Sequence, residues 1–258
     1  MSNAFVEQRG RILLNEPIEL RNSFDTLRNK AFKLSPNFPA GPVISAKGIN
    51  RLSNLIIENV FIDGTGCLNQ VHGLEMERVA ASTISNFHAQ RLQGPGIVLD
   101  SVWNVDIISP HIMYCGEDDS SSNVIITSDA VDGDYSRGTN DVRITGGRLE
   151  GAKCQLSLRQ TTNVVVTGTK LHGNPDDKDP YCLCGLEKVR STHRFCGITT
   201  AHGKQPIFEI YWGDAPAGII IDTADTNWPF QIPRQLVFEC NERPKTSYLK
   251  IPILHHLE

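Results

Sequence analysis

The chain has 258 residues, of which 40% are hydrophobic and 21% charged, with a formal net charge of −4 and a pI near 6.1. These values are close to globular averages, which excludes bulk disorder, and they provide no basic field for a nucleic acid. No apolar run reaches the roughly 18–20 residues of a membrane span, so neither nucleic acid nor membrane is an expected partner.

Residues 1–42 are expected to form N-terminal strands and a cap. Ile12, Leu14, Ile18 and Leu20 alternate with polar residues, which is typical of short β-strands. Residues 36–42 are rich in Pro and Gly and predict a loop. An open sheet end pairs readily with other chains, so this irregular segment is expected to cover the end of a larger sheet. Residues 1–9 lack the apolar core of a secretory signal, so either such a signal has been removed or the protein does not use that export route.

Between residues 54 and 173 one short pattern returns five times, at intervals of 27, 23, 37 and 22 residues. The fourth position is always a β-branched aliphatic residue, namely Ile57, Ile84, Ile107, Ile144 and Val166. In four copies an aliphatic residue follows five places later, namely Ile62, Ile112, Leu149 and Leu171. Fixed patterns at such periods are typical of solenoids, in which each unit buries its apolar face against its neighbours.

A short apolar strand precedes each copy, so one coil reads strand, turn, strand, bend, strand. Helical periodicity is absent between the copies, which makes the expected fold all-β. We expect a β-solenoid of about six to eight coils over residues 43–222. The first polar residue of each copy is expected to stack at one bend as a ladder of Asn54, Asn104, Asp141 and Asn163, with Ala81 as the gap.

Residues 223–258 are expected to form a C-terminal cap or an oligomer contact. Four prolines in this part of the chain suit edges rather than central strands. The C-terminal region also holds four large aromatic residues, Trp212, Trp228, Phe230 and Phe238. Exposed apolar surface generally marks contacts, so these residues favour an oligomer, and the alternative is that they plug the last coil.

With these repeats the chain resembles the single-stranded right-handed parallel β-helix of the pectate-lyase-like superfamily, over about residues 10 to 220. Its Asn-Val-x-Ile, Gly-Gly-Arg-Leu-Glu-Gly and Lys-Leu-His-Gly-Asn elements are most similar to those of bacteriophage tailspike and tail-fibre proteins. This resemblance implies a homotrimer in the virion tail or outside the cell, beside other virion tail proteins. It also implies a protein that recognises, or depolymerises, a host surface polysaccharide.

Two other functions are compatible with the same fold, because fold alone does not determine function. The first is a structural or adhesion β-helix protein without catalysis. The second is a secreted lyase, hydrolase or epimerase of the pectin or alginate type.

The densest group of carboxylates flanks the largest insertion, between Ile126 and Ile144. Its members are Glu117, Asp118, Asp119, Asp132 and Asp134, and Glu150 follows on the next repeat segment. Glycoside hydrolysis generally uses two carboxylates about 5–9.5 Å apart, so these six are the candidate catalytic residues if the protein cuts a glycan. The alternative is that they are hydrated turn residues, because Asp and Ser favour turns.

Basic residues on consecutive repeats could bind a sugar carboxylate. The candidate substrate-binding residues of this kind are Arg143, Arg148 and Arg159. Trp103 and Tyr135 are the candidate aromatic residues for stacking against a sugar. Rows of charge on a solenoid are also typical of its solvated face, so a purely structural role is the alternative.

Seven cysteines are scattered along the chain, and an odd number does not indicate a disulfide framework. Cys182, Cys184, His193 and Cys196 have the chemistry of a tetrahedral zinc site, but the spacing of the first pair is shorter than usual. Scattered core cysteines or a cap disulfide are the alternatives, and no metal site is assigned. No Gly-rich phosphate loop or His-Glu-x-x-His motif is present, so no cofactor is expected.

Overall fold

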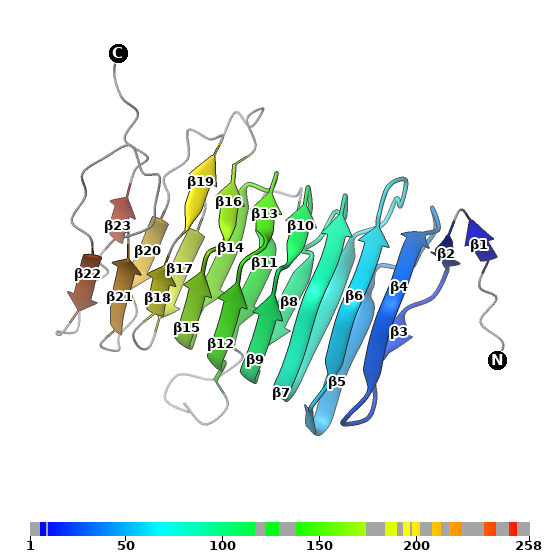
Figure 1. Ribbon diagram of the computed structural model, residues 1–258, viewed down its shortest axis with the longest axis horizontal. Helices are drawn as coiled ribbons and strands as arrows, with labels where there is room; N and C mark the ends of the chain where they lie inside the picture. Colours follow the sequence, from blue (N-terminus) through cyan, green and yellow to red (C-terminus); the bar gives the residue numbers. More distant parts are fainter. Residues whose placement is uncertain are drawn as a thin grey trace, which may run out of the picture.

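The computed structural model describes residues 6–8, 10–116, 122–128, 138–173, 184–189, 193–196, 198–201, 208–212, 217–222, 235–240 and 248–251. Within these ranges every regular element is a β-strand, and no helix capable of crossing a membrane is found there. The strands join in one sheet of 23 strands. They stack side by side along the long axis, with β1 at one end and β22 and β23 at the other (Figure 1).

Most strands pair in parallel with the strand one repeat further on, which produces three stacks that we call the first, second and third faces. The first face contains β3 (Ile18–Glu19), β5 (Gly41–Ser53), the start of β7 (Val71–Gln90), β8 (Ile97–Asp100), β11 (Ser122–Thr127), β14 (Cys154–Arg159), β17 (Cys184–Val189) and β20 (Phe208–Trp212). The second contains parts of β4 (Thr26–Leu34), β6 (Ile56–Asp63) and β7, then β9 (Trp103–Ile108), β12 (Asn140–Thr145), β15 (Thr162–Thr167), β18 (His193–Cys196) and β21 (Ala217–Asp222). The third contains β2 (Arg11–Leu14), the ends of β4, β6 and β7, then β10 (His111–Met113), β13 (Arg148–Glu150), β16 (Lys170–His172) and β19 (Thr199–Ala201).

Both ends of the parallel stack are followed by antiparallel strands. β1 (Val6–Gln8) pairs with β2, while β22 (Gln235–Cys240) and β23 (Tyr248–Ile251) pair with β21 and β20. β2 and β3 already pair in parallel with β4 and β5. The parallel stack therefore includes strands from residues 11–34, which precede the start of the solenoid expected at residue 43. The arrangement is that of the all-β solenoid which the repeats predict.

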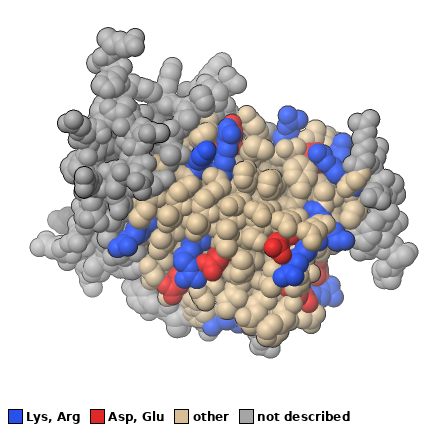
Figure 2. Space-filling view, in the orientation of Figure 1, with Lys and Arg blue, Asp and Glu red and all other residues tan. Residues whose placement is uncertain are grey.

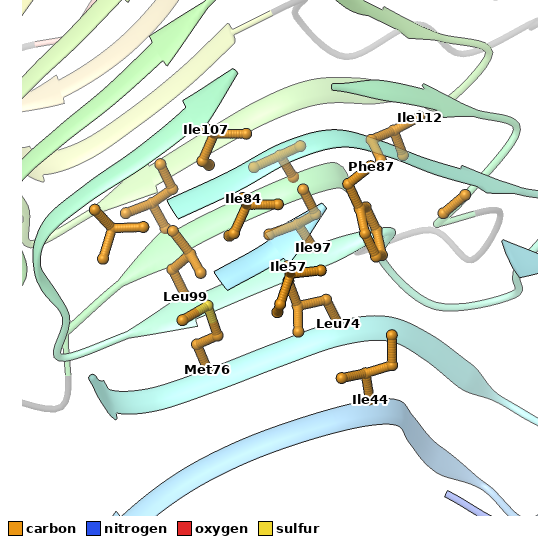
Figure 3. Packing of buried hydrophobic residues seen from close by; sticks show 14 of the residues in the cluster. Ile44, Ile57, Leu74, Met76, Ile84, Phe87, Ile97, Leu99, Ile107 and Ile112 are labelled. Atoms are coloured by element: carbon orange, nitrogen blue, oxygen red, sulfur yellow. The ribbon is translucent and has the colours of Figure 1, made fainter. Parts of the chain in front are cut away.

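The five aligned aliphatic residues of the sequence pattern are direct neighbours on the second face. The register pairs Ile57 with Ile84 and Ile84 with Ile107, and it continues through Ile144 to Val166. All five side chains are at most 1% exposed, and the labelled members point into the interior between the faces (Figure 3). The predicted aliphatic stack is therefore confirmed.

A second buried column runs along the third face and includes the residues five places further on. It contains Ile62, Ala89, Ile112, Leu149 and Leu171 in register. All five are fully buried. Ala89 occupies the one place in this column where the sequence pattern lacked a large aliphatic residue, so the column is continuous.

The bend before the second face is built from residues in the left-handed conformation. Asn54, Ala81, Asn104, Asp141 and Asn163 all have φ between 47° and 59°. Asn163 donates a hydrogen bond to Asp141, and Asn104 Oδ1 accepts one from Arg143 Nη2 at 2.8 Å. The prediction that these residues share one bend is confirmed, although an arginine replaces one of the expected amide contacts.

A continuous asparagine ladder lies at the following bend, where the sequence pattern did not indicate one. Asn86 Nδ2 donates to Asn59 Oδ1, and Asn59 Nδ2 donates to Asn29 Oδ1, each at 3.0 Å. All three have φ between 47° and 53°, a conformation that asparagine adopts more readily than most residues. The ladder holds successive coils at the same bend between the second and third faces.

Candidate functional site

The outward side chains of the third face stand above one another from coil to coil. One outward row contains Phe61, His88, His111, Arg148 and Lys170. The rings of His88 and His111 are stacked, with centroids 4.5 Å apart and planes at 10°, and Phe61 lies tilted with its centroid 6.3 Å from that of His88. This spacing follows the distance of about 4.8 Å between neighbouring strands, so the coil repeat itself creates a ladder of rings.

Arginine–carboxylate pairs lie at both ends of this ring ladder. Arg11 lies over Phe61, with Cζ 4.7 Å from the ring centroid, and its Nη1 contacts Asp63 Oδ2 at 2.6 Å. Burial raises the pKa of Asp63, but hydrogen bonds from Thr65 and Gln90 and the charge of Arg11 together outweigh burial and leave that pKa lowered. At the other end Arg148 Nη2 contacts Glu150 Oε2 at 2.6 Å.

The imidazole of His88 has a lowered pKa. Burial lowers the pKa of His88, and the neighbouring His111 lowers it further because two adjacent imidazolium rings would repel each other. This shift favours the uncharged form of the His88 ring. The ladder presents flat rings with polar edges, which suits hydrogen bonding and stacking rather than strong charge attraction.

At the end of the third face, three successive bends line an open pocket of about 350 Å³. Its lining residues follow β6, β7 and β10 and are Gly64, Thr65, Gly66, Cys67, Arg91, Gln93 and Tyr114. Tyr114 is 41% exposed. A Cβ on Gly151 would lie 2.4 Å from Tyr114 Cδ1, so the ring packs directly on the glycine backbone. A glycine at this position leaves room for the ring and thereby orients it in the pocket.

Among the described residues that line the pocket, Arg91 is the only charged one. Its backbone N donates to Met113 O at 3.1 Å, while its side chain has neither an ion pair nor a hydrogen bond with any residue that the structure describes. Asp63 directly precedes the lining residue Gly64 in the chain. Its carboxylate already accepts hydrogen bonds from Thr65 N at 3.0 Å and from Thr65 Oγ1 at 2.6 Å. The pocket therefore carries one uncompensated positive charge within the described part of the chain.

The three arginines predicted to bind substrate lie on three different faces. Arg143 is in β12 on the second face, where Nη2 contacts Asp106 Oδ2 at 3.1 Å, and that hydrogen-bonded contact raises the pKa of Arg143. Arg148 is in β13 on the third face, and Arg159 is in β14 on the first, where its Nε donates to Ser157 Oγ at 3.2 Å. Only Arg148 lies in the outward row that continues the ring ladder, so the three arginines do not share one face.

The other predicted site residues fall into two groups. Trp103 is half-buried, and the guanidinium of Arg51 covers its ring with Cζ 3.3 Å from the centroid, so that ring face is occupied. Glu150 lies in β13 beside the pocket, because its carbonyl accepts from Tyr114 N at 2.8 Å. The remaining candidates, Glu117, Asp118, Asp119, Asp132, Asp134 and Tyr135, lie outside the described residues.

The metal-like set is not assembled by the residues that the structure describes. Cys184 is buried, which raises the pKa of its thiol, and His193 Nε2 lies 2.8 Å from Thr161 Oγ1. Cys196 is half-buried on the second face, and Cys182 lies outside the described residues. No group of three metal-ligating side chains is found across the described ranges.

Sequence reasoning missed the ring ladder and most of the pocket, although the repeats contain a signal for both. Phe61, His88, His111, Arg148 and Lys170 each lie four residues after the aligned aliphatic residue of their copy. Arg91 and Tyr114 each lie seven residues after it. Reading the outward positions in the register of the buried ones would have found both sets.

Elsewhere in the described part of the chain, several charged side chains form ion pairs. On the visible face, acidic and basic side chains lie beside one another with broad uncharged areas between them (Figure 2). On the first face, Lys47 Nζ contacts Glu75 Oε1 at 2.7 Å and lies 3.8 Å from Glu77 Oε2, and His72 Nδ1 lies 3.9 Å from Glu75 Oε2. This group of paired charges is expected to contribute to the stability of the fold.

Comparison with known proteins yields no matching family model and no matching curated protein. Among solved structures the chain is similar to ORF18 of Geobacillus virus E2, with a TM-score of 0.49 and 13% sequence identity. The match covers 92% of this chain and 58% of that one, so the chain spans less than two thirds of the length of the phage protein.

Proposed function

We propose that this protein is a polysaccharide-binding β-solenoid of the phage tailspike type. In this proposal the third face supports an extended glycan, and the pocket at Tyr114 holds one of its sugars. The observation that carries the proposal is the exposed Tyr114 ring, oriented by Gly151 and placed beside polar side chains in a pocket. An aromatic face accepts the apolar face of a sugar ring, while nearby polar groups bind its hydroxyls.

The remaining lining side chains suit a sugar. Thr65 and Gln93 carry a hydroxyl and an amide, which can both donate to and accept from sugar hydroxyls. The ring ladder of Phe61, His88 and His111 continues from coil to coil on the adjoining face. A surface that repeats along a rod suits a polymer that repeats along its own length.

Replacing Tyr114 by alanine is expected to weaken glycan binding by about tenfold, which corresponds to roughly 1.4 kcal/mol. The measurement is calorimetric titration against surface polysaccharides of candidate host bacteria. Phe24→Ala is the matched control, since Phe24 is also an exposed aromatic residue with positive φ and lies outside the pocket lining. Equal affinities for the wild type and Tyr114→Ala would remove the pocket from the proposal.

Depolymerisation is the enzymatic form of the same proposal. Of the candidate catalytic carboxylates, Glu150 is the one that lies within the described residues. Its ion pair with Arg148 holds it on the third face next to Tyr114. A second carboxylate is expected from the group that includes Glu117, Asp119 and Asp132, because acid–base cleavage needs two groups in different protonation states.

The expected result is that replacing Glu117, Asp119, Asp132 or Glu150 by the matching amide, one at a time, lowers release of oligosaccharide by a hundredfold or more for at least one variant. The measurement is the appearance of reducing ends from a polysaccharide that the protein binds. Full activity in all four variants would place catalysis elsewhere, and binding without cleavage by the wild type would favour the non-enzymatic form.

Location in a virion tail, contact with other tail proteins and assembly as a homotrimer belong to the same proposal. They are supported by the resemblance of the repeats to tailspike proteins and by the aromatic residues of the C-terminal region. Trp212 lies in β20, which pairs with β23, and Phe238 lies in β22, which pairs with β21, while Trp228 and Phe230 lie outside the described residues.

A further inference from the structure

We infer that the pocket selects a sugar that bears a carboxylate, with Arg91 as the residue that determines this specificity. The inference rests on the proposed glycan binding and adds the chemical class of the bound sugar. Its starting point is the single positive charge of the pocket, which no described side chain balances.

The relative placement of Arg91 and Tyr114 suits such a sugar. Both residues follow the third face at equivalent positions, since Arg91 N donates to Met113 O and Tyr114 N donates to Glu150 O one coil further on. Equivalent positions on neighbouring coils are about 4.8 Å apart, which is close to the width of a sugar ring. A sugar stacked on Tyr114 can therefore direct a ring substituent toward the guanidinium of Arg91.

The chemistry of Arg91 favours a carboxylate as that substituent. A guanidinium presents paired N–H donors that match the two oxygens of a carboxylate, and charge-assisted bonds of this kind are stronger than neutral ones. One carboxylate also balances one guanidinium, whereas a phosphate monoester carries a charge of about −1.5 to −2 and would leave the site negative. A sulfate ester carries one charge as well, so the experiment includes a sulfated ligand.

The experiment compares ligands that differ only in the carboxylate. Polygalacturonate, alginate and hyaluronate are each tested beside the same polymer with its carboxyl groups reduced to primary alcohols, and dextran sulfate provides the sulfate arm. The wild-type protein is expected to bind at least one acidic polymer tenfold or more tightly than the reduced form. Arg91→Gln is expected to bind both forms with the affinity that the wild type has for the reduced one.

Two features keep the comparison specific. Glutamine tolerates the backbone at this position, since Gln160 has φ of 52° and Arg91 has φ of 55°. Arg194→Gln is the matched control, because Arg194 is an exposed arginine on the second face, away from the pocket, and its replacement should leave the tenfold preference intact.

Each outcome has a defined consequence. Equal binding of acidic and reduced polymers, or binding of the reduced polymers alone, would overturn the inference and leave the proposed glycan binding in place. Dextran sulfate bound as tightly as the acidic polymer, with the same dependence on Arg91, would overturn the assignment of a carboxylate. Failure to bind any polymer of the panel would count against the inference and the proposed function together.

Discussion

Ile107→Ala is expected to destabilise the protein by about 2–5 kcal/mol. Ile107 is 1% exposed and lies between Ile84 and Ile144 in the buried column of the second face. Removing its side chain loses buried apolar surface and leaves a cavity, because the strands above and below are held by their own ladders and cannot collapse into it. The measurement is the free energy of unfolding from equilibrium denaturant titration.

The matched control is Ile108→Ala, one residue further along β9. Ile108 has the same side chain but points outward and is 42% exposed. Its replacement is expected to cost less than about 1 kcal/mol, which is typical of surface sites. Similar losses for the two variants would show that the register of the buried column is wrong.

Glu75→Gln is expected to remove at most about 3 kcal/mol of stability at neutral pH and to make the protein less sensitive to acid. His72 and Lys47 hold the pKa of Glu75 at about 2, against an ordinary value of 4.5, and burial opposes them. His72 acts as an electrostatic neighbour at 3.9 Å, whereas Lys47 makes the short contact at 2.7 Å. One pKa unit corresponds to about 1.4 kcal/mol, so the difference between these two values corresponds to about 3 kcal/mol.

The sign of the pH dependence follows from the lowered pKa. The stabilising contribution of Glu75 is fully present above pH 4.5 and is lost as the pH falls toward 2, where the folded protein also takes up the proton. The wild type and Glu75→Gln should therefore differ most at pH 7 and converge near pH 2. Unfolding free energies measured across this range test the prediction, and a constant difference between the two proteins would contradict it.

Glu58→Gln is the control for this second prediction. Glu58 contacts Arg28 Nε at 3.0 Å on the second face, with both side chains more than one third exposed. Solvent screens such pairs, so the variant is expected to lose at most about 1 kcal/mol.

The amino-acid sequence by itself determined the coil repeat, the buried columns and the first bend. In a solenoid each unit packs only against its neighbours, so every copy of the repeat has the same short pattern of buried residues. Ile57, Ile84 and Ile107 could therefore be aligned without knowing the fold in detail. Asn54, Asn104 and Asn163 marked one bend, because asparagine tolerates the left-handed backbone that a sharp turn requires.

The tertiary structure alone decided which outward residues meet. His88 and His111 are 23 residues apart in the chain, yet their rings stack because parallel register places them on adjacent coils. Arg143 and Arg148 are five residues apart but lie on different faces, because the bend at Gly146 lies between them. The pocket likewise draws its lining from three successive bends, so Arg91 and Tyr114 come together only when the coils are stacked.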